Sequence, residues 1–332
     1  MSKRIFLTLI IAIVFKLSAS AQKIDTIVYY LKSFRAVDWP SFNDVVPVNN
    51  KDSADFYRVI LPPDTTTDRS LFIVNDFYKN GKPRMVGKTK DRDYRVNLNG
   101  ACIRFFPNGR RKSVENYSNG KLKGSVVEYF PNGKIYLTGM YNDSSKLIID
   151  ESSDSIGKVL AQNGNGHYIK YDESFKQIQS EGDIMDGREN GEWHGILGDT
   201  IKYTCMYVKG VGKNGISHNT NGKEYIFAKA EDEPEFKGGI TSFYKFLQHE
   251  IHYPAVAKQH NVQGKVFLTF VINKEGSLLD IKVVRGIGSG CDEESVRVLR
   301  QSPKWRPGKL YGVPVRVQYT MPISYTLAYE NR

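Results

Sequence analysis

The stretch GVPVRVQYTMPISYTL, residues 312–327, decides the fold of the C-terminal part of the chain. Every odd-numbered position from 313 to 327 is apolar, whereas the even-numbered positions carry Pro, Arg, Gln, Thr, Pro, Ser and Thr. This alternation predicts a single strand with one buried and one solvent-exposed face. It is longer than the strands it can pair with, so part of it should overhang. Pro322 cannot donate to a sheet ladder, and we therefore expect it at an exposed edge.

The residues before this strand predict a mixed helix and strand domain. Apolar side chains spaced for one helical face indicate a helix over residues 240–251, and Pro254 begins a second, short helix. Two strands are expected at 264–273 and 276–286, followed by a helix from residue 291. Together with the final strand, these elements predict an α+β domain, a three-stranded antiparallel sheet with helices on one face, over residues 237–328.

The order of short motifs in this region resembles the C-terminal domain of TonB. The motifs EFKGG, YPAVAKQH, GKV, PKWRPG and VPVRV follow one another between residues 235 and 317, and the resemblance covers residues 231–328. It implies a domain of the Gram-negative periplasm. Such a domain captures the TonB-box peptide of outer-membrane receptors by adding it as a strand to the sheet edge, next to the final strand.

The same resemblance implies which residues would bind the peptide. The segment before the Tyr-Pro motif would make side-chain contacts, and the binding edge would lie on the final strand. The peptide-contact segment is Glu250, Ile251, His252 and Tyr253, and the binding edge is Arg316, Val317, Gln318, Tyr319, Thr320, Met321, Ser324 and Tyr325.

The N-terminus predicts export from the cytoplasm. Lys3 and Arg4 precede an apolar run that Lys16 closes, and LSASA follows. This pattern indicates a signal peptide over residues 1–21, cleaved between Ala21 and Gln22. The apolar run is shorter than the roughly 20 residues that span a bilayer. We therefore expect a periplasmic protein; the alternative is an inner-membrane anchor with a periplasmic C-terminal domain and proton-channel partners, as in a complete TonB transducer. Such a transducer also has a proline-rich spacer, and this chain has only 13 prolines.

The central part of the chain repeats a short turn motif. Ten Asn-Gly pairs lie between residues 80 and 222, and the copies include FYKNGK, FFPNGR, YSNGK and YFPNGK. Asn-Gly favours the tight turns of β-hairpins. The pattern predicts an all-β meander of stacked hairpin repeats over residues 71–227, and over 70–225 it resembles the MORN-type repeats of bacterial envelope proteins. Residues 22–70 stay unassigned, and residues 228–236 are expected to be a linker.

Basic side chains are concentrated in this central part. Residues 76–146 hold 15 basic and 6 acidic side chains. They either form a solvated sheet face or meet anionic lipid, envelope polysaccharide or an acidic partner. Nucleic acid is not an expected partner of an exported protein.

The sequence predicts no enzyme, no cofactor and no metal site. His249 and His252 lack a third ligand in a metal-binding spacing. The cysteines, Cys102, Cys205 and Cys291, are far apart and allow at most one disulfide. No nucleophile, base and oxyanion site come together.

Two functions from different classes follow. The first is a TonB-like protein that binds receptor peptides by strand addition and is linked to energy-dependent transport across the outer membrane. The alternative is an envelope scaffold or surface-binding protein that uses the basic repeats, with the C-terminal domain as a protein-interaction or homodimerisation module.

Overall fold

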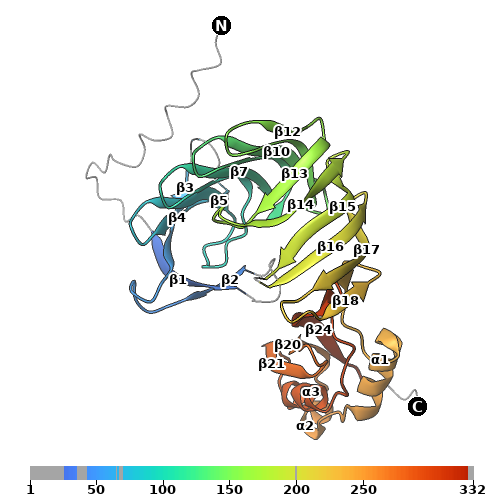
Figure 1. Cartoon of the computed structure of the whole chain (residues 1–332). Coiled ribbons are helices and arrows are strands. Elements are labelled where there is room, and N and C mark those ends of the chain that lie inside the picture. Colours follow the sequence, from blue (N-terminus) through green and yellow to red (C-terminus); the bar gives the residue numbers. More distant parts are fainter. Residues whose placement is uncertain (1–25, 36–42, 65, 67–69, 199, 328–332) are drawn as a thin grey trace, which may run out of the picture.

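The computed structural model describes residues 26–327 apart from 36–42, 65, 67–69 and 199. In this part of the chain a long antiparallel sheet curls round on itself, and a small domain with three helices is attached at its last strands (Figure 1). The expected signal peptide, with Ala21 and Gln22, lies outside the described residues. Among the residues that are described, no helix is long and apolar enough to cross a membrane.

The curled sheet is built from eighteen strands in chain order. From β3 to β7 and from β9 to β18 each strand pairs antiparallel with the next, β1 pairs with β2 and β3, and β7 pairs with β8 and β9. The strands are β1 (Ile27–Arg35), β2 (Asn43–Pro47), β3 (Phe56–Pro63), β4 (Phe72–Tyr78), β5 (Pro83–Thr89), β6 (Gly100–Phe105), β7 (Arg111–Ser118), β8 (Lys121–Leu122), β9 (Gly124–Tyr129), β10 (Ile135–Tyr141), β11 (Leu147–Ser153), β12 (Val159–Gln162), β13 (Asn165–Tyr171), β14 (Ile178–Met185), β15 (Arg188–Leu197), β16 (Ile201–Val208), β17 (Val211–His218) and β18 (Glu224–Phe227).

The sheet begins before the region that the sequence assigned to hairpins. Residues 22–70, left unassigned above, contribute β1, β2 and β3. The burial pattern of β3 includes a charged residue, because Arg58 is buried and forms two 2.7 Å hydrogen bonds with the buried carboxylate of Asp76 on β4. Because a charged residue occupies a buried position, alternation of apolar and polar residues does not predict β3.

Aromatic rings lie across glycines on the neighbouring strand and form the inner face of the curled sheet. Gly182 pairs with Trp193, and a Cβ added at Gly182 would lie 2.5 Å from the indole ring. Gly195 pairs with Tyr203 in the same way. Because glycine leaves room for the ring, each aromatic covers the adjacent strand. Trp193 and Tyr203 belong to two neighbouring apolar clusters of the sheet.

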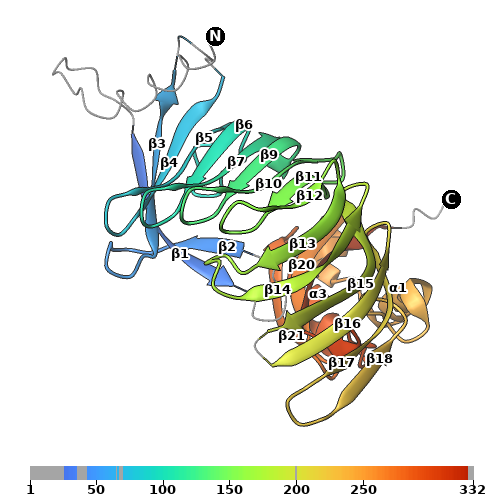
Figure 2. The same ribbon diagram turned by 45° about the horizontal axis from the view of Figure 1, so that its top comes forward.

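The hairpin turns stack on one another along one rim of the sheet. The Asn108 side chain donates to the carbonyl of Pro131 in the next turn at 3.1 Å, and that of Asn132 donates to the carbonyl of Ser155 at 2.8 Å. The Lys82 ammonium donates in the same direction to the Asn108 carbonyl at 3.2 Å. Figure 2 shows these strands, β5 to β12, in a row. The Asn-Gly turns therefore bond neighbouring hairpins to each other.

The C-terminal domain contains the α+β fold expected from the sequence. The main sheet has the order β21-β20-β24 and is antiparallel. Buried side chains of α1, α3, β20 and β24 form one core, which also includes Trp305. The elements are β19 (Glu231–Asp232), α1 (Gly239–Glu250), α2 (Ala255–Gln259), β20 (Gly264–Ile272), β21 (Leu278–Arg285), α3 (Cys291–Arg300), β22 (Lys309–Leu310), β23 (Val313–Pro314) and β24 (Val317–Tyr325).

The prediction of one continuous strand over residues 313–327 is wrong. Its first residues form β23, which belongs to a separate small sheet with β19 and β22, and the main sheet receives β24 alone. Val313, Val315 and Val317 are all buried, so the apolar alternation continues across the break although the chain changes sheets. The segment expected to be a linker, 228–236, contains β19 and an isolated bridge from Glu235 to Arg306.

Candidate functional site

Strand β24 has one unpaired side. It pairs with β20 in an unbroken register from Gly264–Tyr325 to Ile272–Val317, and no other strand of the described residues pairs with it. This register runs through Pro322, which lies opposite Phe267. Because proline has no N–H, its nitrogen occupies a position that faces away from β20. Backbone direction alternates along a strand. The backbone N–H and C=O groups of Gln318, Thr320 and Ser324 therefore face the same free side of β24 as the nitrogen of Pro322.

The side chains of β24 divide into two sets. Val317, Met321 and Tyr325 are buried in the apolar cores beneath the sheet, although the sequence placed them in the peptide-binding edge. Tyr319 is half-buried, with its ring 6.2 Å from that of Phe270. The exposed set is Gln318, Thr320, Pro322 and Ser324. The structure thus offers an incoming strand mainly backbone groups and small polar side chains.

Tyr325 fixes the C-terminal end of the edge strand. Its hydroxyl donates to the Cys291 carbonyl at 3.0 Å and lies 2.9 Å from the Ser295 hydroxyl, both on α3. Burial is the main cause that raises the pKa of Tyr325 to about 12. The ring of Tyr253 meets the ring of Tyr325 edge-on, with centroids 5.4 Å apart. This contact brings the segment 250–253 to the end of β24.

Comparison with known families agrees with this arrangement. The family described as "Gram-negative bacterial TonB protein C-terminal" matches residues 249–327. Residues 249–327 are thus similar to this family, and the part of the chain from β19 to β24 is called the TonB-type domain below. The match covers α2, α3 and the whole of the β21-β20-β24 sheet. The matched family is a non-enzymatic, transport-associated domain.

Among solved structures, the TonB-type domain is similar to the NMR solution structure of Helicobacter pylori TonB-CTD (residues 179–285). The identity is 23%, the alignment covers 27% of this chain and 82% of that chain, and the TM-score is 0.22. No curated protein matches the chain. The similarity of the C-terminal part of the chain to this family therefore rests on the family match alone.

The segment 250–253 is held in the TonB-type domain by an ion pair on α3 that the sequence analysis missed. The Glu294 carboxylate accepts from the His252 N–H at 2.6 Å, and the Arg297 guanidinium donates to the Glu250 carbonyl at 2.6 Å. Glu294 and Arg297 also bond to each other at 2.7 Å. The hydrogen bond from Arg297 is the main cause that lowers the pKa of Glu294. Their spacing of three residues within DEESVR is the signal that identifies such a helical pair.

Arg316 lies outside the edge strand, in the two-residue gap between β23 and β24. Its guanidinium is 3.4 Å from the Asp280 carboxylate on β21, and both side chains are largely exposed. A surface pair of this kind contributes about 1 kcal/mol or less. Arg316 is therefore not one of the backbone positions of the edge strand, and its side chain pairs with β21 at the other edge of the sheet.

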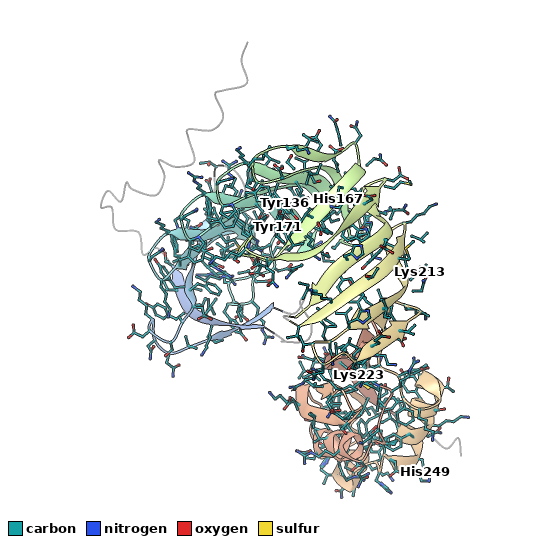
Figure 3. The ribbon with its side chains drawn as sticks, viewed as in Figure 1. Tyr136, His167, Tyr171, Lys213, Lys223 and His249 are labelled. Atoms are coloured by element: carbon teal, nitrogen blue, oxygen red, sulfur yellow. The ribbon has the colours of Figure 1, made fainter. Side chains whose placement is uncertain are left out.

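The histidines and cysteines of the described part of the chain do not gather into one site. No group of three metal-ligating side chains comes together there. The side chain of His249 is 84% exposed and lies at the end of the domain remote from the curled sheet (Figure 3). Cys102, Cys205 and Cys291 are free and buried, and burial raises the pKa of the first two thiols to about 11.

Proposed function

We propose that the TonB-type domain captures an extended TonB-box-type peptide of an outer-membrane receptor by adding it as a strand along β24. The observation that carries this proposal is the row of unpaired backbone groups at Gln318, Thr320 and Ser324, next to an unbroken ladder with β20. A cross-strand ladder recognises backbone rather than a fixed sequence, and alternate side chains supply specificity.

The magnitude of this interaction suits a transient contact. Each hydrogen bond contributes roughly 0.5 to 1.5 kcal/mol net, so about four of them supply roughly 2 to 6 kcal/mol before ordering costs. The backbone bonds alone thus correspond to dissociation constants from about 30 mM to about 40 μM, before any side-chain contact is counted. Several bonds that are loaded together along the strand nevertheless resist a pull, which is what energy-dependent transport across the outer membrane requires. The protein then works in the periplasm, and inner-membrane proton-channel partners enter only where the N-terminus stays anchored.

The curled sheet is proposed as a MORN-type repeat scaffold for this domain. The stacked turns support the proposal, since equivalent Asn side chains bond the next turn. The basic side chains of these turns bond the next turn too, because Arg110 donates to the Asn132 carbonyl and Lys134 to the Ile156 carbonyl. This use of the cations favours a structural role over a surface that binds anionic lipid or polysaccharide.

Titration of a fluorescent TonB-box-type peptide with the mature full chain tests peptide capture. Thr320→Pro removes one outward N–H from the edge, and Thr320→Ala is the matched control that keeps the backbone donor. We expect Thr320→Pro to weaken binding about tenfold, by lost and blocked ladder bonds, and Thr320→Ala to change it less than about twofold.

Three outcomes would contradict the proposal: no binding by the wild type at millimolar peptide, equal binding by all three chains, or an edge already occupied by a second copy. Sedimentation of the wild type and Thr320→Pro separates the last case, because a homodimer paired through β24 would dissociate in the variant.

A further inference from the structure

The hairpin between β22 and β23 joins the TonB-type domain to the last strands of the curled sheet. Tyr311 at its tip stacks on Tyr203 of β16, with ring centroids 3.7 Å apart and an interplanar angle of 11°. Its hydroxyl lies 2.9 Å from that of Tyr207, and its carbonyl accepts from the buried Ser217 hydroxyl at 2.7 Å. The Tyr311 N–H donates to the Ala230 carbonyl at 2.6 Å. One residue thus bonds or stacks with β16, β17 and the segment that precedes β19.

The residues on either side of Tyr311 extend the same junction. Gly312 has a φ of 77°, and a Cβ there would lie 3.2 Å from the Cβ atoms of both Tyr225 and Phe227. Leu310, Val315 and Val317 form a separate apolar cluster, against which Leu197 of β15 packs. Val317 is also the first residue of β24. The start of the proposed peptide-binding strand therefore shares a core with the curled sheet.

Elements of the TonB-type domain hold residues 313–316, just before β24, only weakly, whereas Val317 itself pairs with Ile272 of β20. The strands β22 and β23 have two residues each and pair through two positions. Paired strands this short are not stable by themselves in water. At the other end of β24, Tyr325 is fixed by α3 inside the domain's own core. The segment that leads into β24 thus packs against the curled sheet, whereas the end of the strand is fixed by α3.

We propose that Tyr311 is a positioning residue for the peptide-binding edge: anchored in the curled sheet, it orders residues 313–319 so that the first ladder positions of β24 are preformed. This inference rests on the proposed function, since it names what prepares the same edge. In this chain the curled sheet is then a required part of the peptide site rather than a spacer. An edge that is ordered before binding saves the peptide complex the entropy of ordering it.

Site-resolved amide hydrogen exchange of the full chain tests the inference without any peptide. The variants are Tyr311→Ala, Tyr311→Phe, which keeps the ring, and Ser217→Ala, which removes one hydrogen bond at the anchor. The control is Tyr244→Ala, a 56% exposed tyrosine on α1. We expect Tyr311→Ala to speed exchange of the Val313, Val315, Val317 and Tyr319 amides about tenfold or more, because local opening no longer breaks a stacked contact. Exchange at Val266 and Leu268 of β20, which pair with the other end of β24, should stay within about twofold.

Rescue distinguishes positioning from general stability. Tyr311→Phe should restore most of the protection, Ser217→Ala should lie between it and Tyr311→Ala, and the control should match the wild type. Unchanged exchange at 313–319 in Tyr311→Ala, or equal acceleration throughout the domain, would overturn the inference. If Tyr311→Ala does not fold, the exchange rates of the other two variants test the inference: at residues 313–319, exchange should be faster in Ser217→Ala than in Tyr311→Phe, and the reverse order would overturn it.

Peptide titration of the same variants then tests whether the anchoring of Tyr311 affects peptide binding. We expect about tenfold weaker binding for Tyr311→Ala and near wild-type binding for Tyr311→Phe. A wild type that fails to bind would refute the proposed function and leave the exchange result intact. Equal peptide affinity of the wild type and Tyr311→Ala, together with faster exchange at residues 313–319 in the variant, would refute a role of Tyr311 in peptide binding.

Discussion

Glu128 on β9 makes the stability of the curled sheet depend on pH. Burial, and next the neighbouring charge of Glu115, raise the pKa of the Glu128 carboxyl from its ordinary value of 4.5 to about 7, against the opposing effect of Lys112 and Lys170. A raised folded-state pKa means that the folded protein is penalised for carrying the charge. The penalty is absent below about pH 4.5, grows between there and pH 7, and is complete above pH 7.

The replacement Glu128→Gln measures this penalty. A difference of about 2.5 pKa units at 1.36 kcal/mol each gives about 3 kcal/mol. The side chain keeps some contact with solvent, so we expect the variant to be more stable than the wild type by about 2 kcal/mol at pH 8. At pH 4 the two proteins should differ by less than about 0.5 kcal/mol.

Urea unfolding, followed by the fluorescence of Trp193 within the same sheet, provides the assay. Glu224→Gln on β18 is the control, because Glu224 is an exposed carboxylate in a surface ion pair with His218. The control should change stability by less than about 0.5 kcal/mol at either pH. Equal effects of Glu128→Gln at pH 4 and pH 8, or a loss of stability at pH 8, would refute the reasoning.

Two further changes test the packing. Gly182→Ala places a methyl group against the Trp193 ring and should destabilise the sheet by about 1 to 3 kcal/mol. Gly87→Ala meets ordinary contacts of 3.4 Å or more, and an equal loss of stability there would remove the steric explanation. Tyr325→Phe deletes the hydroxyl bonded to α3 and should cost about 1 to 2 kcal/mol in thermal or urea unfolding. Tyr244→Phe on the surface of α1 should stay within about 0.5 kcal/mol, and a larger cost there than for Tyr325→Phe would contradict this account.

Much of the C-terminal domain follows from its sequence. The strands β20 and β21 and the helix α3 lie where apolar spacing and helix-end charges placed them. The start of the final strand could not be predicted from the sequence. Val313 and Val315 keep the apolar alternation, but Val313 pairs in another sheet and Val315 lies between the two strands. Alternation reports which side chains are buried and carries no information about which strand is the partner.

The residues proposed for the candidate site lie on an edge strand, and their role in peptide binding stays a prediction. No strand of the described residues other than β20 pairs with the edge from Gln318 to Ser324, and the inward side chains of Met321 and Tyr325 belong to the core. Tyr311 carries no spacing signal for the contact that it makes, because its partners on β16 and β17 lie roughly one hundred residues earlier in the chain. Contacts of this range become visible only when the two parts of the chain are placed together.

Disulfide capture at Thr320 tests the central claim, peptide addition along β24, most directly. A strand added to this edge lies about 4.8 Å from β24 and about twice that from β20, and a disulfide needs Cα atoms about 4.4 to 6.8 Å apart. Thr269 lies directly opposite Thr320 on β20 and provides the control position. The three native cysteines are buried, so an introduced thiol is the accessible one.

The measurement is the disulfide yield between each variant and TonB-box-type peptides that carry one cysteine at successive positions. The account predicts a high crosslink yield to Thr320→Cys at the one peptide position that lies opposite residue 320 and low yields at the positions on either side of it, because neighbouring side chains of a strand face opposite sides and positions two residues away are about 7 to 8 Å distant. Few crosslinks to Thr269→Cys are expected at any position. Equal yields at both sites, or no dependence on peptide position, would contradict strand addition at β24.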